Sequence, residues 1–144
     1  MSDPSYALQI AIRKRLVSTP ALVALVPAEN ILDTHSLPVV DPCIIFGEDQ
    51  EIDPDEQTIT RRMVRVYSTL HVWKREESLR GVKLIAGAIR RAIETTYRLN
   101  LDDPDFHCAD CHVSEVRFMR DPDGVTSHGI VTLDSLVAKM WVPA

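Results

Sequence analysis

The clearest pattern along the chain is a strict alternation of apolar and polar positions over residues 63–74. Alternation of this kind predicts a β-strand with two unlike faces. The apolar set predicts a face in the core and comprises Val64, Val66, Leu70 and Val72. The other set is amphipathic and includes Tyr67, His71 and Trp73, which is typical of a sheet face covered by something other than the chain's own helix, a partner being one candidate.

Two segments have the helical spacing of apolar residues. Residues 5–18 place Leu8, Ile12 and Leu16 on one side, which predicts an amphipathic helix. Residues 78–98 predict a longer helix whose first turn Ser78 caps. Its expected buried stripe is Leu79, Val82, Ile85, Ala86, Ile89 and Ile93.

The remaining elements are short or extended. Thr19 and Pro20 begin a short helix that Pro27 stops, and short extended segments are expected at 31–32 and 43–46. Residues 121–124 form a turn between two strands. The order α-β-β-α-β-β predicts an α+β fold, with two main helices on one face of a mostly antiparallel sheet of four strands or slightly more.

Length and composition fit one domain over residues 1–144. Of the 144 residues 45% are hydrophobic and 26% are charged, and no apolar run approaches the length of a membrane span. The start lacks a secretory signal because Arg13, Lys14 and Arg15 interrupt its apolar residues. Three cysteines without such a signal suit a reducing compartment. We therefore expect a soluble protein of the cytoplasm with no membrane partner.

Charge is segregated along the chain. Residues 41–60 hold seven acidic residues and no basic one, whereas residues 61–91 hold nine basic residues against Glu76 and Glu77. One interpretation is a solvated acidic loop over residues 48–56, projecting and mobile until it meets a neighbour. The other is a pair of unlike surfaces that meet in an assembly. The candidate interface residues are Glu48, Asp49, Glu51, Asp53, Asp55, Glu56, Arg61, Arg62, Tyr67, His71 and Trp73.

The segment FHCADCH, residues 106–112, contains the C-x-x-C-H pattern of covalent haem attachment. Haem attachment requires export, of which the chain shows no means. Zinc sites draw ligand pairs from separated segments, whereas His107, Cys108, Cys111 and His112 are crowded together. We expect these four weak metal candidates to lie unoccupied where a loop feeds a strand. The alternative is a small metal- or redox-binding protein.

Catalytic and nucleotide motifs are missing. The sequence has only five glycines, and neither a glycine-rich phosphate loop nor G-x-S-x-G nor H-E-x-x-H occurs. Cys43 lies among apolar residues and is expected in the core. We therefore expect no enzymatic activity and no cofactor. The net charge of −5 argues against duplex binding by the whole surface, although the basic residues of 61–91 leave open a small regulatory nucleic-acid-binding module.

Several segments, in this order, resemble the tail-completion or tail-terminator proteins of long-tailed phages, prophages and gene transfer agents. The resemblance extends over nearly the whole chain and consists of similar short segments in the same order. Its signals are P-x-I-I-x-G-E, the H-V-W end of a strand, and R-D-x-D-G followed by T-x-H-G. The segments are YALQIAIRKRL, LVALVPAENILD, PCIIFGED, STLHVWKRE with IAGAIRRAI, and FMRDPDGVTSHGIVTLDSLV.

The resemblance implies a non-enzymatic virion structural protein. Such proteins form a ring, usually a hexamer, that caps the head-proximal end of the tail tube, ends its polymerisation and joins the tail to the neck of the head. The implied partners are further copies of the chain, the major tail tube protein and a head-side neck or stopper protein, while DNA passes through the lumen without specific binding. The protein would be made in the bacterial cytoplasm and incorporated at the head-tail junction. FHCADCH departs from the family pattern, and another neck or connector role remains an alternative.

Overall fold

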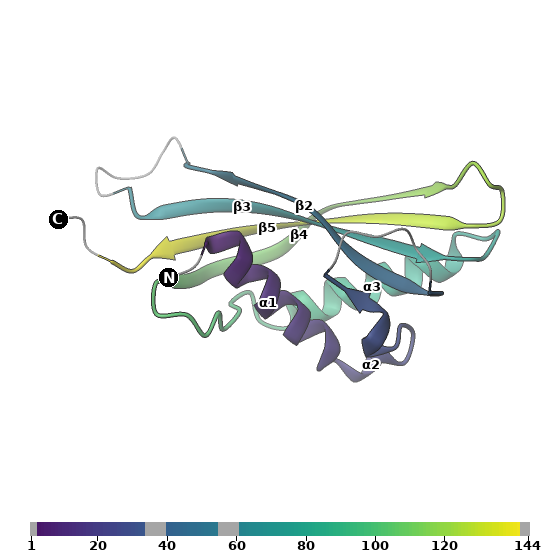
Figure 1. The fold of residues 1–144 in the computed structure, drawn as a ribbon, viewed down its shortest axis with the longest axis horizontal. Coiled ribbons are helices and arrows are strands. Elements are labelled where there is room, and N and C mark those ends of the chain that lie inside the picture. The colour runs from purple at the N-terminus through teal and green to yellow at the C-terminus, as the bar shows by residue number, and fades with distance from the viewer. Residues whose placement is uncertain (1–2, 34–39, 55–60, 142–144) are drawn as a thin grey trace.

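The computed structural model describes residues 3–33, 40–54 and 61–141. It forms two layers, with a twisted sheet above and the helices below (Figure 1). The elements in chain order are α1 (Pro4–Val17), α2 (Pro20–Val23), the 3-10 turn η1 (Ala28–Asn30), β1 (Ile31–Leu32), β2 (Cys43–Ile52), β3 (Met63–Lys74), α3 (Arg80–Glu94), β4 (Phe106–Arg120) and β5 (Ser127–Lys139).

The α+β class is confirmed, but the expected α-β-β-α-β-β order and antiparallel sheet hold only in part. The sheet has five strands in the order β1-β2-β3-β5-β4. Three strand pairs are antiparallel, whereas β1 runs parallel to β2 and pairs Ile31 with Ile44. The short extended piece at 31–32 therefore joins the sheet and makes it mixed. Asn30 of η1 supports this pairing, because its side-chain amide donates a hydrogen bond to the Pro42 carbonyl just before β2, at 2.9 Å.

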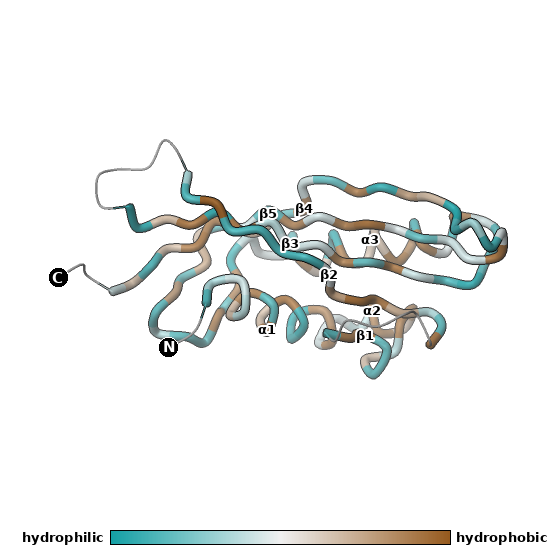
Figure 2. The backbone as a smooth tube through the Cα atoms, turned by 45° about the horizontal axis from the view of Figure 1, so that its top comes forward, coloured by the Kyte–Doolittle hydropathy of each residue, from teal (hydrophilic) through white to brown (hydrophobic). Residues whose placement is uncertain are grey.

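The alternation of residues 63–74 produces β3 as predicted. Val64, Val66, Leu70 and Val72 are buried and face the helices. They share one core with Ile85, Ile89 and Ile93 of α3 and with Leu8, Ile12 and Leu16 of α1. Figure 2 shows the hydrophobic segments of the helices beneath those of the strands. The predicted helical stripes are therefore the ones that meet the sheet.

Side chains outside the helices define where each long helix begins. The Asp3 carboxylate accepts hydrogen bonds from the amides of Ser5 and Tyr6 at the start of α1, at 3.0 and 3.3 Å. At the start of α3, Ser78 accepts from the amide of Arg80, and Glu76 accepts from the amide of Gly81. Ser78 and Glu76 therefore accept hydrogen bonds from the first turn, but Leu79, not the predicted Ser78, occupies the N-cap position.

One arginine joins the two long helices. The Arg15 guanidinium donates hydrogen bonds to the carbonyl oxygens of Ala92 and Arg98 and to the Thr96 hydroxyl, at 2.9, 3.4 and 3.1 Å. These acceptors lie at or beyond the carboxyl end of α3, where unpaired carbonyls and the helix dipole favour a cation. The helix ends at Glu94, before the predicted residue 98.

Candidate interaction surfaces

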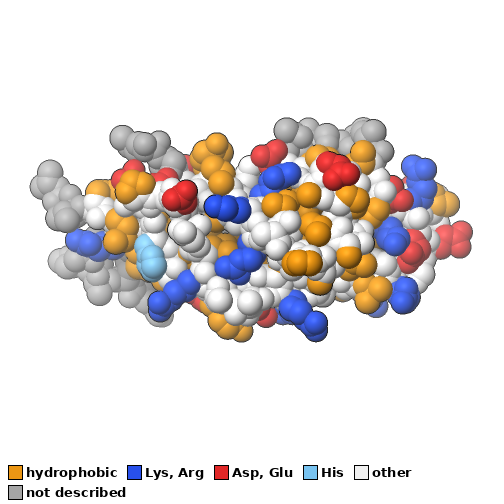
Figure 3. Space-filling model, turned by 90° about the horizontal axis from the view of Figure 1, so that it is seen from below, with side chains coloured by type: hydrophobic (Ala, Val, Ile, Leu, Met, Phe, Trp, Pro, Cys, Tyr) orange, Lys and Arg blue, Asp and Glu red, His pale blue; other side chains and the backbone are white. Residues whose placement is uncertain are grey.

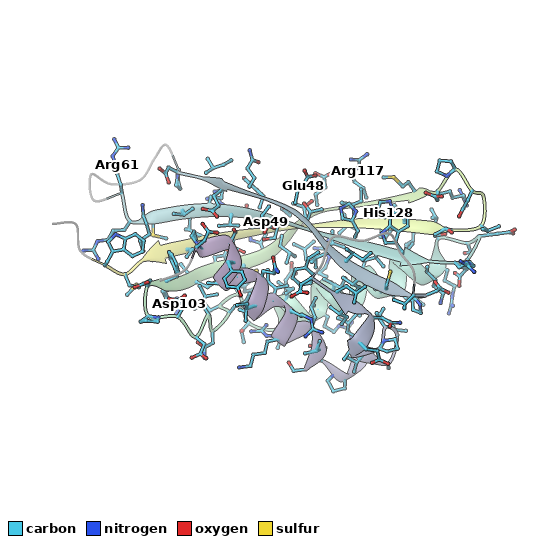
Figure 4. The ribbon with its side chains drawn as sticks, in the orientation of Figure 1. Glu48, Asp49, Arg61, Asp103, Arg117 and His128 are labelled. Carbon is cyan, nitrogen blue, oxygen red and sulfur yellow. The ribbon has the colours of Figure 1, made fainter. Side chains whose placement is uncertain are left out.

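The face of the sheet opposite the helices, here called the open face, has no helix of the described chain against it (Figure 1). Figure 4 shows Glu48 and Arg117 on this side of the sheet. Strand register places the following side chains on it: Arg65, Tyr67, Thr69, His71 and Trp73 of β3, His128, Ile130, Thr132, Asp134 and Leu136 of β5, and Asp110, His112, Glu115, Arg117 and Met119 of β4. The predicted face with Tyr67, His71 and Trp73 is therefore one that the chain's own helices do not cover.

Three rings stack on one end of the open face. The His128 imidazole lies between Trp73, with ring centroids 3.7 Å apart, and His71, with centroids 5.1 Å apart. His71 Nδ1 and His128 Nε2 are 2.9 Å apart and share a hydrogen bond. On the other side of His71, a Cβ added at Gly47 would lie 2.7 Å from the imidazole. Glycine at this position therefore allows the ring to pack against the β2 backbone.

The stack favours neutral imidazoles. Burial lowers the pKa of His128 from 6.5 to about 4, and the neighbouring His71 adds to the effect. Burial also lowers the pKa of His71, and the nearby negative charge of Glu48 offsets part of this decrease. Both rings are therefore uncharged at neutral pH, which lets one nitrogen donate and the other accept in their mutual hydrogen bond.

A charged cluster occupies the other end of the open face. Arg65 Nη1 donates to Asp134 Oδ1 at 2.7 Å, and this contact raises the pKa of the guanidinium. His112 Nδ1 lies 3.0 Å from an Asp110 carboxylate oxygen, and its Nε2 lies 4.0 Å from Asp134. The cluster connects β3, β5 and β4, so it fixes the side chains of this end of the face relative to one another.

Over residues 48–52 the acidic segment is part of a strand and not of the projecting loop that its composition predicts over 48–56. Glu48, Asp49 and Glu51 belong to β2, which pairs with β3 as far as Ile52. The backbone pairing with β3 outweighs the low β-propensity of these residues. Asp53 is exposed just after the strand, whereas Asp55 and Glu56 lie outside the described residues. The acidic side chains therefore line a sheet edge instead of a loop.

Two of these acids turn toward the start of α1. Burial raises the pKa of Glu51, which shares a hydrogen bond with Asp3, and burial likewise raises the pKa of Asp49 near Ser68. Ser68 lies on the helix side of β3 and is itself buried. This group of carboxylates holds the β2 edge close to the first turn of α1.

Arg61 and Arg62 lie at the same end of the sheet as the last residues of the acidic strand. They directly precede β3, and the register that pairs Arg65 with Ile52 puts them beside the end of β2. Figure 4 shows Arg61 at this end of the molecule. The charges that are segregated in sequence are thus partly adjacent in space, because β2 and β3 run antiparallel.

The four residues of the C-x-x-C-H region fall on opposite faces of β4. The whole of FHCADCH is part of this strand, which is longer than the loop and strand start that we expected. A bulge between Cys108 and Asp110 places Cys108 and Cys111 on the same, core-facing side. His112 lies on the open face and His107 is exposed. The cysteines and histidines therefore do not converge on one point.

The thiols are poorly suited to bind or react. Burial raises the pKa of Cys108, and it raises the pKa of Cys111 to about 12. Cys43 is fully buried, as expected, and burial raises the pKa of its thiol to about 11. Over residues 3–33, 40–54 and 61–141, no group of three or more His, Cys, Asp or Glu side chains is placed to hold a metal ion. No helix in the described ranges has the length and hydrophobicity needed to cross a membrane.

Sequence reasoning missed the part that β5 plays. His128 of β5 shares a hydrogen bond with His71, which is one of the candidate interface residues. Asp134 of β5 accepts a hydrogen bond from Arg65, which lies on the same face of β3. The sequence signal was weak, because polarity alternates clearly only over residues 131–134, whereas burial alternates along most of the strand. Only the register, which pairs Trp73 with His128, brings these side chains together.

Comparison with known proteins gives a consistent picture. A sequence profile of the family described as tail completion protein gp17 matches residues 10–138. The fold is similar to that of a chain in the virion of a native gene transfer agent (GTA) particle, with a TM-score of 0.77, 17% sequence identity, and coverage of 93% of this chain and 96% of that one. It is also similar to the gp17 protein of bacteriophage SPP1, with a TM-score of 0.57, 21% identity, and coverage of 92% and 89%. No curated protein matches the sequence at a significant level.

Proposed function

The chain belongs to the tail completion protein gp17 family, and from this membership we propose that it is a non-enzymatic subunit of a six-fold ring at the head-proximal end of a phage-like tail. The ring would end polymerisation of the tail tube and join the tail to the head. The profile match over residues 10–138 carries the proposal. The protein would be made in the bacterial cytoplasm and incorporated into the particle at the head-tail junction.

The open face supports an assembly role. It is wide, it lacks a helix in the described chain, and it presents half-buried aromatic side chains such as Tyr67 and Trp73. Aromatic residues are enriched where proteins meet because they bury a large area and keep a polar group at the edge. The stack of Trp73, His128 and His71 also holds its rings in fixed positions, which lowers the entropy lost on docking.

A ring needs two unlike surfaces on each subunit, because heterologous contacts bury one patch against a different patch of the next copy. The tube protein below and a head-side neck or stopper protein above would take further surfaces. DNA would pass through the lumen without specific binding. The net charge of −5 suits this passage, because a negative lumen repels phosphates.

The geometry gives no support to the metal or redox alternative. That alternative requires His107, Cys108, Cys111 and His112 to act together, and the two cysteines face the core while the histidines do not. The proposed function uses none of the four as a ligand.

The mass of the purified protein in solution tests the proposal. Light scattering should give a hexamer for the protein alone or after addition of the tube protein from the same particle. A control with an unrelated tube protein should leave the mass unchanged. A monomer under both conditions, at concentrations well above those that saturate particles, would contradict the ring.

A further inference from the structure

The outer side of α3 carries a stripe of exposed residues rich in cations, of which Lys83 reaches over the Phe118 ring of β4 and Arg90 pairs with Glu94. Its exposed positions recur at helical spacing, so they line one side of the helix. The stripe, here called the α3 stripe, comprises Arg80, Lys83, Leu84, Gly87, Arg90 and Arg91. Leu84 is 47% exposed near its centre. Figure 3 shows the helix-bearing side of the molecule, on which Lys and Arg side chains lie among hydrophobic and acidic ones.

Nothing in the described part of the subunit requires glycine at position 87. A Cβ built there meets no atom of the described residues within 4 Å, and its backbone is helical. Glycine inside an exposed helix costs stability relative to alanine, because it loses more conformational freedom on folding. A glycine kept at the centre of a cationic stripe leaves a bare backbone surface where another chain can approach closely.

The acidic edge of β2 has the complementary chemistry. β1 pairs with β2 only at Ile44 and Ile45, so β2 beyond Phe46 forms a free edge of the described sheet. This acidic edge exposes Glu48 and, just after the strand, Asp53, whereas Asp49 and Glu51 turn toward Ser68 and Asp3 of the same subunit. A bulge between Phe46 and Asp49 and the density of charge discourage a second strand from pairing here. We therefore expect this edge to bind a partner through its side chains and not through backbone hydrogen bonds.

We propose that the α3 stripe of one subunit docks against the acidic edge of a second copy, the next subunit of the ring. The inference rests on the proposed ring function and assigns the two surfaces through which neighbouring subunits of the ring meet. Arg80 and Arg91 meet Glu48 and Asp53, with Leu84 and Gly87 as the uncharged centre of the contact. The two surfaces differ, and they lie far apart on the subunit, because β2 is near one edge of the sheet while α3 packs mainly against β3, β4 and β5. This is the arrangement that a heterologous contact requires.

Gly87→Ala provides the first test, since it separates stability from assembly. In the subunit the change should raise the melting temperature by about 2–4 °C, because the added methyl group meets open space and favours the helix. In the ring the methyl group stands in the contact, so the midpoint concentration for assembly should rise by about tenfold or more. A variant that assembles as well as the wild-type protein would overturn the proposal.

Reversing the charges of both surfaces tests whether the α3 stripe binds the acidic edge of a second copy. Arg80→Glu with Arg91→Glu should weaken assembly, and so should Glu48→Lys with Asp53→Lys. All four changes together should restore much of it. Lys14→Glu with Arg98→Glu reverses two exposed cations outside the stripe and should leave assembly unchanged.

The outcomes distinguish the two proposals. If the wild-type protein forms a ring and the variants of Gly87 and of the two charged surfaces form it equally well, the ring stands and this contact is wrong. If the acidic-edge reversal does not restore assembly of the α3 reversal, the acidic edge is not the partner of the α3 stripe. The same conclusion follows if the α3 reversal abolishes binding of a short DNA duplex and leaves self-association intact. If the wild-type protein forms no ring with tube protein present, both proposals fail. Salt dependence of wild-type assembly, weakening between 50 and 500 mM NaCl, is the further expected result.

Discussion

The imidazole of His128 lies parallel to the indole of Trp73, with the two ring centroids 3.7 Å apart and an interplanar angle of 7°. The same imidazole shares a hydrogen bond with His71 on its other side. This arrangement joins β3 to β5 across the open face, and burial beside His71 disfavours the charged form of His128. Protonation of His128 should therefore oppose the folded state.

The first prediction concerns the pH dependence of stability. The pKa of His128 is about 4 in the folded protein against an ordinary value of 6.5, so the unfolded chain binds more protons between these values. The free energy of unfolding should consequently fall as the pH is lowered from 6.5 toward 4. His128→Asn removes this contribution, so its loss of stability from pH 7 to pH 4.5 should be smaller than that of the wild-type protein. Urea unfolding at the two pH values measures the difference.

His107→Asn is the matched control for this experiment. His107 is exposed at the start of β4 and takes no part in the stack. The variant should keep the wild-type pH dependence. Equal losses of stability in wild type, His107→Asn and His128→Asn would show that the stack does not suppress protonation.

The second prediction tests the core. Ile89 is fully buried between α3 and the sheet, so Ile89→Ala should lower the free energy of unfolding by roughly 2–5 kcal/mol. Leu84→Ala changes an exposed residue of the same helix and should alter it by less than about 0.5 kcal/mol. Denaturant unfolding at neutral pH measures both. Similar losses for the two variants would mean that the buried side of α3 has been assigned wrongly.

The third prediction concerns the cysteines. All three are buried with raised thiol pKa values, so a disulfide-exchange reagent at pH 8 should label none of them in the native protein and three after denaturation. Protein purified without chelator should contain less than one equivalent of zinc or iron. Stoichiometric metal that is lost in Cys108→Ser would contradict this reading of the C-x-x-C-H region.

The sequence predicted those parts of the fold in which side-chain pattern and burial agree. The alternation around Val66 and Leu70 and the helical spacing around Ile89 each specify one face, and the core burial of these residues follows. The extension of β2 through Glu48 and Glu51 was not predictable in the same way. Gly, Asp and Glu disfavour strands, and only pairing with β3 over a bulge makes this segment extended.

The candidate sites depended on information that the linear sequence does not contain. The spacing of Cys108 and Cys111 predicts opposite faces for a regular strand, but the bulge between them puts both in the core. Arg61 and Arg62 belong to a basic segment in sequence but lie just beyond the end of the acidic strand once β2 and β3 pair. The contact of Trp73 with His128 requires the β3–β5 register, which joins residues 55 positions apart.

Imaging of particles made without this protein tests the central proposal most directly. A ring that ends the tube and joins it to the head predicts DNA-filled heads that are not attached to tails, beside tails that are overlong or unfinished. Supplying the wild-type protein in trans should restore joined particles, which controls for effects on neighbouring genes. Full heads attached to tails of normal length in the absence of the protein would contradict the proposed function.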